Sequence, residues 1–194
     1  MSETPVIATI VEGHGEVKAL PVLLRRMAAE RGHAHIDVPN PWRLDRGRYA
    51  SKLADTARAA TKRVRTSGGL LVVLDADDDC PVSLAEELRS TMAAYVSHCP
   101  IEVAVACREF EAWFLASLAS LHRHRDVVPG DEVADPDAPR GAKELLERRM
   151  TSKYSPTLHQ PAFAAMMDIR VAVERSRSFR HLDTALSRLL SSST

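Results

Sequence analysis

Three carboxylates follow two apolar segments that have the composition of buried strands. Glu12 comes directly after the segment 5–11, and Asp75 and Asp77 come after the segment 70–74. In an open parallel sheet, ligands bind outside the carboxyl ends of the strands, where the strand order reverses. Residues two apart in an extended backbone point the same way, so Asp75 and Asp77 can converge. If the two strands are neighbours, all three side chains share one pocket.

A divalent cation is the natural partner of such a pocket. Carboxylates held close together raise each other's pKa values, and a bound cation removes that cost. Oxygen ligands with room for water favour Mg²⁺ or Mn²⁺ over zinc, and these ions serve phosphoryl chemistry. We therefore predict Glu12, Asp75 and Asp77 as metal ligands and catalytic residues, with Glu12 as a ligand or as a general acid or base. Acidic loops are often only solvated, and Asp78 and Asp79 leave the choice of ligands open.

Two further acids, Glu109 and Glu111, lie in "CREFEAWFLA" at the end of a later apolar segment. At the carboxyl edge of the sheet they could supply a second metal site, and the structural alternative for Glu109 is a cap on the following helix. Glu16 most simply stabilises a helix dipole, with a supporting role at the site as the alternative. Trp113 and Phe114 are predicted core residues.

Candidate phosphate contacts lie in three places. Gly13 and Gly15 in "VEGHGE" let the backbone approach an anion at a helix N-terminus. The dinucleotide fingerprint is incomplete there, and the phosphate-loop pattern GxxxxGK[ST] is absent. Lys143, Arg177 and Arg180 are predicted to contact phosphate or nucleic acid, and each is equally consistent with a solvated helix. A basic stretch with aromatic neighbours is a further nucleic-acid candidate or an ordinary exposed loop: Arg43, Arg46, Arg48 and Lys52, near Trp42 and Tyr49.

Composition narrows the class of protein. The chain has 194 residues, 45% of them hydrophobic, and a formal net charge of zero, which argues against a globally basic, DNA-coating protein. Its three cysteines form no zinc-type pattern, and no signal peptide or membrane span is evident. We expect a cytoplasmic protein without membrane association. The sequence leaves open whether it acts as a homodimer.

Hydrophobic periodicity predicts an α/β fold with a parallel sheet. Strands are expected at 5–11, 34–38, 70–74 and 101–107, and helices at 16–31, 49–65, 83–96 and from 109 onward. The stretch 123–140, rich in Pro, Asp and Gly, is predicted to be a loop or lid. Residues 141–194 are predicted to form three short helices. The predicted organisation is an α/β domain at 1–122, the loop at 123–140, and a helical tail at 141–194 that packs on the same domain.

Several motifs together resemble the Toprim fold, the metal-binding module of primases, topoisomerases and overcoming-lysogenization-defect (OLD) nucleases. The wider pattern is similar to a bacterial Toprim-like domain-of-unknown-function branch with "VEGHGE", "LDADDDCP", "EFEAWFLAS", "GAK", "YSPTLHQ" and "SRSFRHL". The resemblance spans nearly the whole chain. It implies a Rossmann-like parallel sheet in which Glu12, Asp75 and Asp77 hold magnesium. No primase zinc motif or topoisomerase tyrosine context is present.

The leading hypothesis from these residues is a Mg²⁺-dependent Toprim-type nuclease that cuts DNA or RNA. A second hypothesis is a non-catalytic or conditionally active subunit that works beside a separate ATPase, as the resemblance implies for bacterial anti-phage defence. A third is a small-molecule phosphohydrolase with Asp75 as nucleophile. The position of Asp75 after a later strand, with Glu12 after the first, disfavours the third hypothesis.

Overall fold

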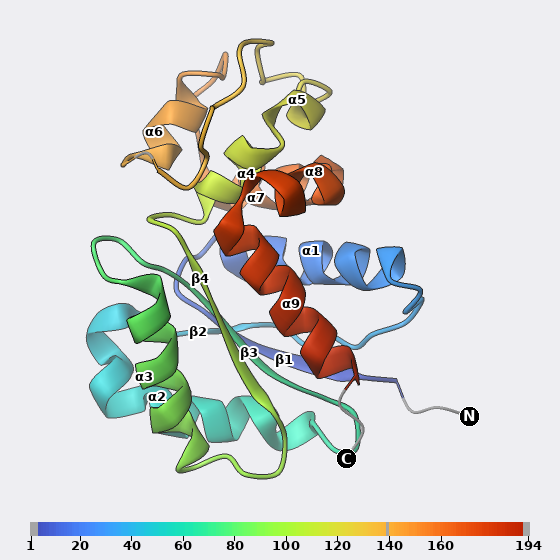
Figure 1. Ribbon diagram of the computed structural model, residues 1–194, viewed down its shortest axis with the longest axis vertical. Helices are drawn as coiled ribbons and strands as arrows, with labels where there is room; N and C mark the ends of the chain where they lie inside the picture. Colours follow the sequence, from blue (N-terminus) through green and yellow to red (C-terminus); the bar gives the residue numbers. More distant parts are fainter. Residues whose placement is uncertain (1–3, 139, 192–194) are drawn as a thin grey trace.

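A four-stranded parallel sheet forms the centre of the molecule (Figure 1). The computed structural model describes residues 4–138 and 140–191. The strand order is β2-β1-β3-β4. The strands are β1 (Val6–Val11), β2 (Trp42–Arg43), β3 (Gly68–Asp75) and β4 (Ile101–Ala106). This arrangement confirms the predicted α/β fold with a parallel sheet flanked by helices.

Helices cover both faces of the sheet. They are α1 (Glu16–Glu30), α2 (Tyr49–Ala60), α3 (Pro81–Ala93), α4 (Glu111–Ala116), α5 (Leu118–Leu121), α6 (Ala142–Glu147), α7 (Pro156–Met166), α8 (Ile169–Arg175) and α9 (Arg177–Ser191), with 3-10 turns at Arg46–Arg48 and Thr61–Arg63. Successive residues of a strand face opposite sides of the sheet, so the core consists of two hydrophobic clusters, one on each face. Ile7 and Val11 pack with α1 and α9, whereas Ala8 and Ile10 pack with α2 and α3. In Figure 1 the strands run upward toward α4 to α8.

The strand order reverses between β1 and β3, which are adjacent parallel strands. From β1 it crosses to β2 on one side, where Ile10 pairs with Trp42, and then returns to β3 on the other side, where Val11 pairs with Val73. The ends of β1 and β3 therefore flank the switch point at which such sheets bind ligands. Glu12 follows β1, and Asp75 is the last residue of β3.

The second strand differs from the prediction. The segment 34–38 contributes only one isolated bridge, between Asp37 and Val6, and β2 is a two-residue strand inside the basic stretch that follows. Pro39 and Pro41 separate the two pairings, and proline lacks the N–H that would continue a ladder. The alternating apolar pattern at 34–38 is thus too short to form a strand by itself.

Two helix predictions also need correction. The helix predicted at 83–96 begins earlier than expected, because α3 starts at Pro81 after Cys80; proline is well suited to the first helical position. The tail contains four helices, α6 to α9, and not three short ones, and α9 has 15 residues. Among the described residues, no helix is both long enough and apolar enough to cross a membrane.

Asp137 connects the predicted loop at 123–140 to α9. Its Oδ1 accepts hydrogen bonds from the hydroxyls of Ser176 and Ser178, both at 2.8 Å, and its Oδ2 accepts from the Ser178 N–H at 3.1 Å. Ser178 in turn accepts from Trp113 Nε1 at 2.8 Å. All of these residues are buried. The serines of "SRSF" therefore hold the start of α9 against the core.

Aromatic side chains contact one another within the core on the α9 side, and the prediction that Trp113 and Phe114 are core residues is confirmed. Both are fully buried, and Phe114 makes edge contacts with Phe110 at 5.5 Å and with Phe163 at 5.6 Å between ring centroids. These contacts join α4 to α7, so they attach the tail to the sheet domain.

We predict that Phe114→Ala lowers the free energy of unfolding by about 3–5 kcal/mol, because it removes a buried ring and leaves a cavity. The matched control is Leu158→Ala, since Leu158 is 65% exposed; it should change stability by no more than about 0.5 kcal/mol. Urea unfolding at neutral pH measures both. Equal effects of the two substitutions would contradict the assignment of this core.

Candidate functional site

Four acidic side chains gather where β1 and β3 end. They are Glu12, Glu16, Asp75 and Glu111, here called the acidic cluster. Glu16 is only 3% exposed and Glu111 only 5%, which is rare for carboxylates. The charges of Glu16, Glu111 and Glu12 each raise the pKa of Asp75, so all four groups interact electrostatically. The cluster draws on β1, the start of α1, β3 and the start of α4.

The "VEGHGE" turn folds back over its own backbone. The Glu12 N–H donates to Glu16 Oε2 at 3.3 Å. A side chain at Gly13 would place its Cβ 2.4 Å from Glu16 Oε1. A glycine at this position therefore leaves room for the Glu16 carboxylate beside the turn. Glu16 is also the first residue of α1, and its negative charge interacts favourably with the helix N-terminus.

Gly15 has a different role, in packing. A Cβ at Gly15 would lie 2.2 Å from Gln160 Oε1 and 2.7 Å from the Pro156 carbonyl oxygen, so the turn packs directly against α7. Gln160 Nε2 also donates to Glu111 Oε1 at 3.1 Å. The segment "YSPTLHQ" thus supplies a buried hydrogen-bond partner to the acidic cluster.

Burial raises the pKa of every carboxyl group in the cluster. The pKa of Glu16 rises to about 7, mainly through burial and then through the charge of Glu111. The pKa of Asp75 lies well above its ordinary range, through burial and the neighbouring acids. Burial also raises the pKa of Glu111, against the lowering effect of the Gln160 hydrogen bond. It raises the pKa of Glu12 too, although the Arg46 charge opposes that rise.

Two carboxylate oxygens in the cluster have no partner. Glu12 Oε2 and Asp75 Oδ1 are both buried and accept no hydrogen bond, although Asp75 as a residue is partly exposed. Buried polar atoms are nearly always satisfied, and leaving one unsatisfied costs about 1–3 kcal/mol. These oxygens are therefore suited to accept a proton or to bind a cation.

Asp77 does not point alongside Asp75. Its φ of +49° places it in the left-handed region within a turn, so the predicted extended backbone from Asp75 to Asp77 is wrong. Its side chain is 64% exposed and pairs with Arg46 at 2.8 Å. Asp77 nevertheless lies close enough to Glu12 to raise the pKa of that residue.

Arg46 is a cation whose charge acts on the acidic cluster. It pairs with Asp77 and Asp79, and its Nη1 donates to the Asp75 carbonyl oxygen at 3.4 Å. It also lowers the pKa of Glu12. The residue comes from the basic stretch that follows β2, so this stretch contributes a counter-ion to the acidic site.

Glu109 and Glu111 diverge although they are two residues apart. Glu111 joins the acidic cluster, whereas Glu109 Oε2 accepts from the Lys143 backbone N–H at 2.8 Å and so caps α6. Glu109 also lines a small open pocket of about 150 Å³ with Asp77, Asp78, Arg108, Arg140 and Gly141. The five predicted ligands therefore do not form one set. Within residues 4–138 and 140–191, no three Asp, Glu, His or Cys side chains already form a group that could hold a metal ion.

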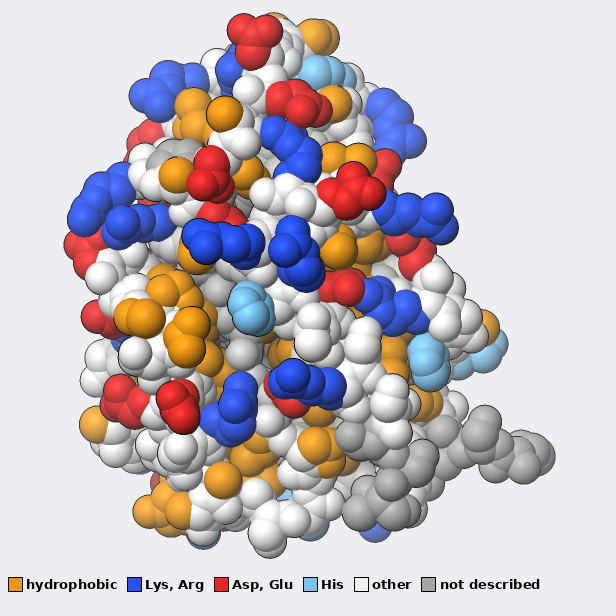
Figure 2. Space-filling view, viewed as in Figure 1, with side chains coloured by type: hydrophobic (Ala, Val, Ile, Leu, Met, Phe, Trp, Pro, Cys, Tyr) orange, Lys and Arg blue, Asp and Glu red, His pale blue; other side chains and the backbone are white. Residues whose placement is uncertain are grey.

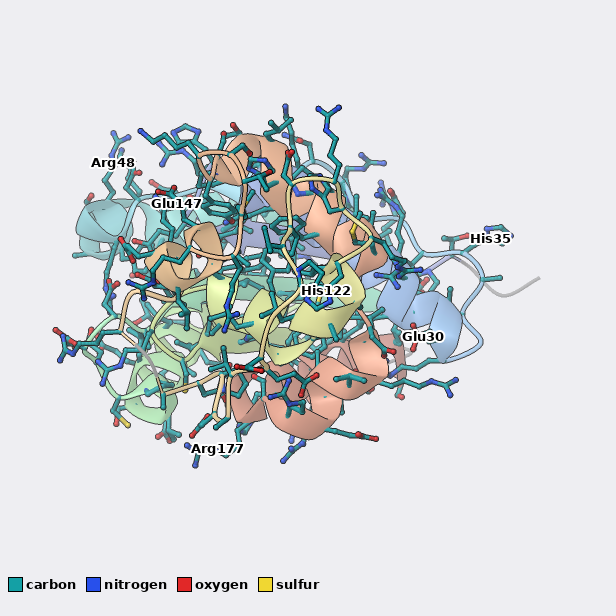
Figure 3. The ribbon with its side chains drawn as sticks, turned by 90° about the horizontal axis from the view of Figure 1, so that it is seen from above. Glu30, His35, Arg48, His122, Glu147 and Arg177 are labelled. Carbon is teal, nitrogen blue, oxygen red and sulfur yellow. The ribbon has the colours of Figure 1, made fainter. Side chains whose placement is uncertain are left out.

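The predicted phosphate contacts on the tail lie on two helices, Lys143 on α6 and Arg177 and Arg180 on α9. Arg180 donates to the carbonyl oxygens of Val173 and Glu174, both at 3.0 Å, and so caps the end of α8. Lys143 and Arg177 are exposed. Figure 3 shows that Arg48 and Arg177 point outward on different sides of the molecule. Arg48 of the basic stretch and Arg177 at the start of α9 therefore do not share one surface.

Sequence reasoning considered a site role for Glu16 only as the alternative to a helix-dipole role, and it missed the roles of Arg46 and Gln160. Arg46 and Gln160 come from segments that only tertiary packing brings to the strand ends.

The fold and the cluster define an α/β protein with a buried acidic site at the switch point of a parallel sheet. The chain belongs to the family described as "Domain of unknown function (DUF4276)", which matches residues 11–187. A comparison with curated proteins found no match. Among solved structures, the chain is similar to the C-terminal region of the Burkholderia pseudomallei OLD protein, with 15% identity and a TM-score of 0.43 over 98% of this chain and 100% of that chain.

We predict that the free energy of unfolding falls as the pH rises from about 4.5 to above 7. Because burial raises the pKa of Glu16 from 4.5 to about 7, the native state binds more protons than the unfolded state in this window, and it loses stability as they leave. Glu16→Gln should flatten the fall, and Glu87→Gln, on the exposed side of α3, should not. Urea midpoints measured across the window test this, and parallel pH curves for wild type and Glu16→Gln would contradict it.

The two glycines of the turn should respond differently to substitution. Gly15→Ala is expected to lower stability by about 1–3 kcal/mol, because its Cβ meets the α7 backbone at Pro156. Gly13→Ala meets only the flexible Glu16 side chain, so it should cost less but move that carboxylate and weaken the pH dependence. Thermal unfolding at two pH values distinguishes them, and a larger loss for Gly13→Ala would contradict these contacts.

Proposed function

We propose that this chain is a divalent-cation-dependent phosphodiesterase of the Toprim type that acts on DNA or RNA. The observation that carries the proposal is the buried acidic cluster at the switch point, where two carboxylate oxygens have no partner. Burying several like charges without a ligand costs free energy, and apolar side chains could fill the same space without that cost. The resemblance of "VEGHGE" and "LDADDD" to Toprim motifs supports the same reaction class.

The chemistry of the site fits Mg²⁺ or Mn²⁺. The cluster and its surroundings offer only oxygen ligands, which these ions prefer. Glu12 and Asp75 would hold the cation, with Asp77, Glu16 and Glu111 as further candidates. Because no described group of three ligands is already assembled, the proposal includes a rearrangement of carboxylate side chains on binding. When bound, the ion would polarise a phosphoryl oxygen and lower the pKa of water.

The chain's own residues would orient the substrate and exchange protons. Arg46 and Arg108 lie beside the loop 76–80 that follows β3, here called the acidic loop. Arg46 pairs there with Asp77 and Arg108 with Asp78, so both can offset the charge of a phosphate. Burial raises the pKa of Glu12, and a raised carboxyl pKa favours a role in proton transfer. Lys143 is exposed on α6 and its own backbone N–H donates to Glu109 Oε2, so we propose it as a phosphate contact from the tail.

A second candidate function is a non-catalytic or conditionally active subunit that binds nucleic acid beside a separate ATPase, in bacterial anti-phage defence. The ion pairs of Arg46 with Asp77 and Asp79 favour this candidate, because they neutralise acids that a cation would otherwise use. A partner that displaced Arg46 would then switch the site on. In either case we expect the chain to act in the cytoplasm.

We predict that the purified chain cleaves plasmid DNA or labelled RNA with Mn²⁺ or Mg²⁺, and that Asp75→Asn lowers the rate by roughly 10²-fold or more. The matched control is Glu87→Gln, which replaces an exposed acid outside the site. Calorimetric titration with Mn²⁺ measures cation binding separately. Hydrolysis of p-nitrophenyl phosphate tests the third hypothesis, a small-molecule phosphohydrolase.

The outcomes separate the candidates. Cleavage and Mn²⁺ binding that both depend on Asp75 would support the phosphodiesterase. Mn²⁺ and oligonucleotide binding without cleavage would favour the subunit of a separate ATPase. Cleavage that persists in Asp75→Asn, or Mn²⁺ binding that the substitution leaves unchanged, would contradict the proposed site.

A further inference from the structure

A groove runs along the outer edge of the sheet. β4 is an edge strand, and α3 and α9 pack beside it on opposite faces, as Figure 1 shows. The free side of β4 forms the floor of this groove, which we call the β4 groove, and the two helices form its walls. Its volume is about 560 Å³, within the range of about 300–1,000 Å³ found for ligand sites. The β4 groove is separate from the acidic cluster.

The floor of the β4 groove carries unpaired backbone groups. The carbonyl oxygen of Pro100 accepts a hydrogen bond from the Leu70 N–H in β3, and that of Ala106 accepts one from the Ala76 N–H just after β3, both at 2.9 Å. In a parallel pair, every second residue directs its N–H and C=O to the same neighbour. Val103 and Val105 lie at the intervening positions and therefore direct theirs into the groove, where no described strand pairs with them. Such an edge is a template for another strand.

The two walls differ in chemistry. On the α3 side, Val82 and Ala85 line the groove, and Val82 is 69% exposed, which is unusual for a large apolar residue. On the α9 side, Arg177, His181 and Thr184 line it. Figure 2 shows hydrophobic side chains over the start of α3, with Lys, Arg and His side chains over α9. Arg177 stands at the surface at the start of α9 (Figure 3).

We infer that the β4 groove binds an extended segment of a partner protein, which pairs with β4 as a fifth strand. Successive side chains of a strand point to opposite faces. The bound segment therefore alternates apolar residues, which contact Val82 and Ala85, with acidic residues, which contact Arg177 and His181. Main-chain hydrogen bonds to Val103 and Val105 supply affinity, and the two walls supply specificity.

Charge and composition argue against two other occupants. If a second copy paired with β4 about a two-fold axis normal to the sheet, α9 would face its own counterpart and bring its cationic residues together. A single nucleic-acid strand would stack its bases on aromatic side chains, and none lines the groove among the described residues.

The test uses a short synthetic peptide of alternating Val and Glu, titrated into the full, isotope-labelled chain and followed by amide NMR. We expect the amide signals of Val103 and Val105 to shift, and Arg177→Glu to weaken binding at least about tenfold. Arg170→Glu, an exposed arginine on α8 outside the groove, is the matched control and should have no effect. A peptide of alternating Val and Lys should bind much more weakly.

The same peptide N-methylated at alternate backbone nitrogens separates strand pairing from side-chain attraction, and it should not bind. Equal binding of the methylated peptide, or no shift at Val103 and Val105 with any peptide, would overturn the inference. Two further results would also overturn it. One is a dimer in sedimentation that the peptide dissociates, which assigns the edge to a second copy; the other is a single-stranded oligonucleotide that shifts the same amides.

Discussion

The burial of several carboxyl groups at one end of the sheet is the constraint on which the rest of this structure depends. Glu16 and Glu111 are almost fully enclosed, and Asp75 carries a buried oxygen without a partner. An ionised carboxylate in such surroundings is costly unless a proton, a cation or a hydrogen bond offsets its charge. The raised pKa values of the cluster are the direct expression of this cost. Apolar residues would fill the same space more stably, so the acids point to a binding role.

The chain meets this constraint with contacts from distant segments. The Glu12 backbone and Gln160 each donate a hydrogen bond to an acid of the cluster, and Arg46 offsets the charge around Glu12. Gly13 gives the Glu16 carboxylate its space. The helical tail is therefore part of the site, because α7 supplies Gln160 and packs against the turn that follows β1.

β4 links the two regions of the molecule for which we propose roles. On its inner side Ala106 pairs with Asp75, at the acidic cluster, and on its outer side Val103 and Val105 face the β4 groove. The same strand then leads directly into Arg108, which pairs with Asp78 in the acidic loop. A strand bound to Val103 and Val105 would thus be only a few residues along β4 from Ala106 and Arg108, which contact the acidic region.

The sequence by itself determined the fold class, three of the four strands and the placement of Glu12 and Asp75 at strand ends. These features depend on local runs of apolar residues and on turn glycines, which a linear pattern expresses fully. It also identified Trp113 and Phe114 as core. Only the tertiary structure decided that β1 and β3 are neighbours and that Glu16 and Glu111 lie near Asp75 while Glu109 faces α6. It also decided that Arg46 pairs with Asp77 and offsets the charge of Glu12. The physical reason is that strand order and helix packing set distances between residues far apart in the chain, and periodicity carries no record of those distances.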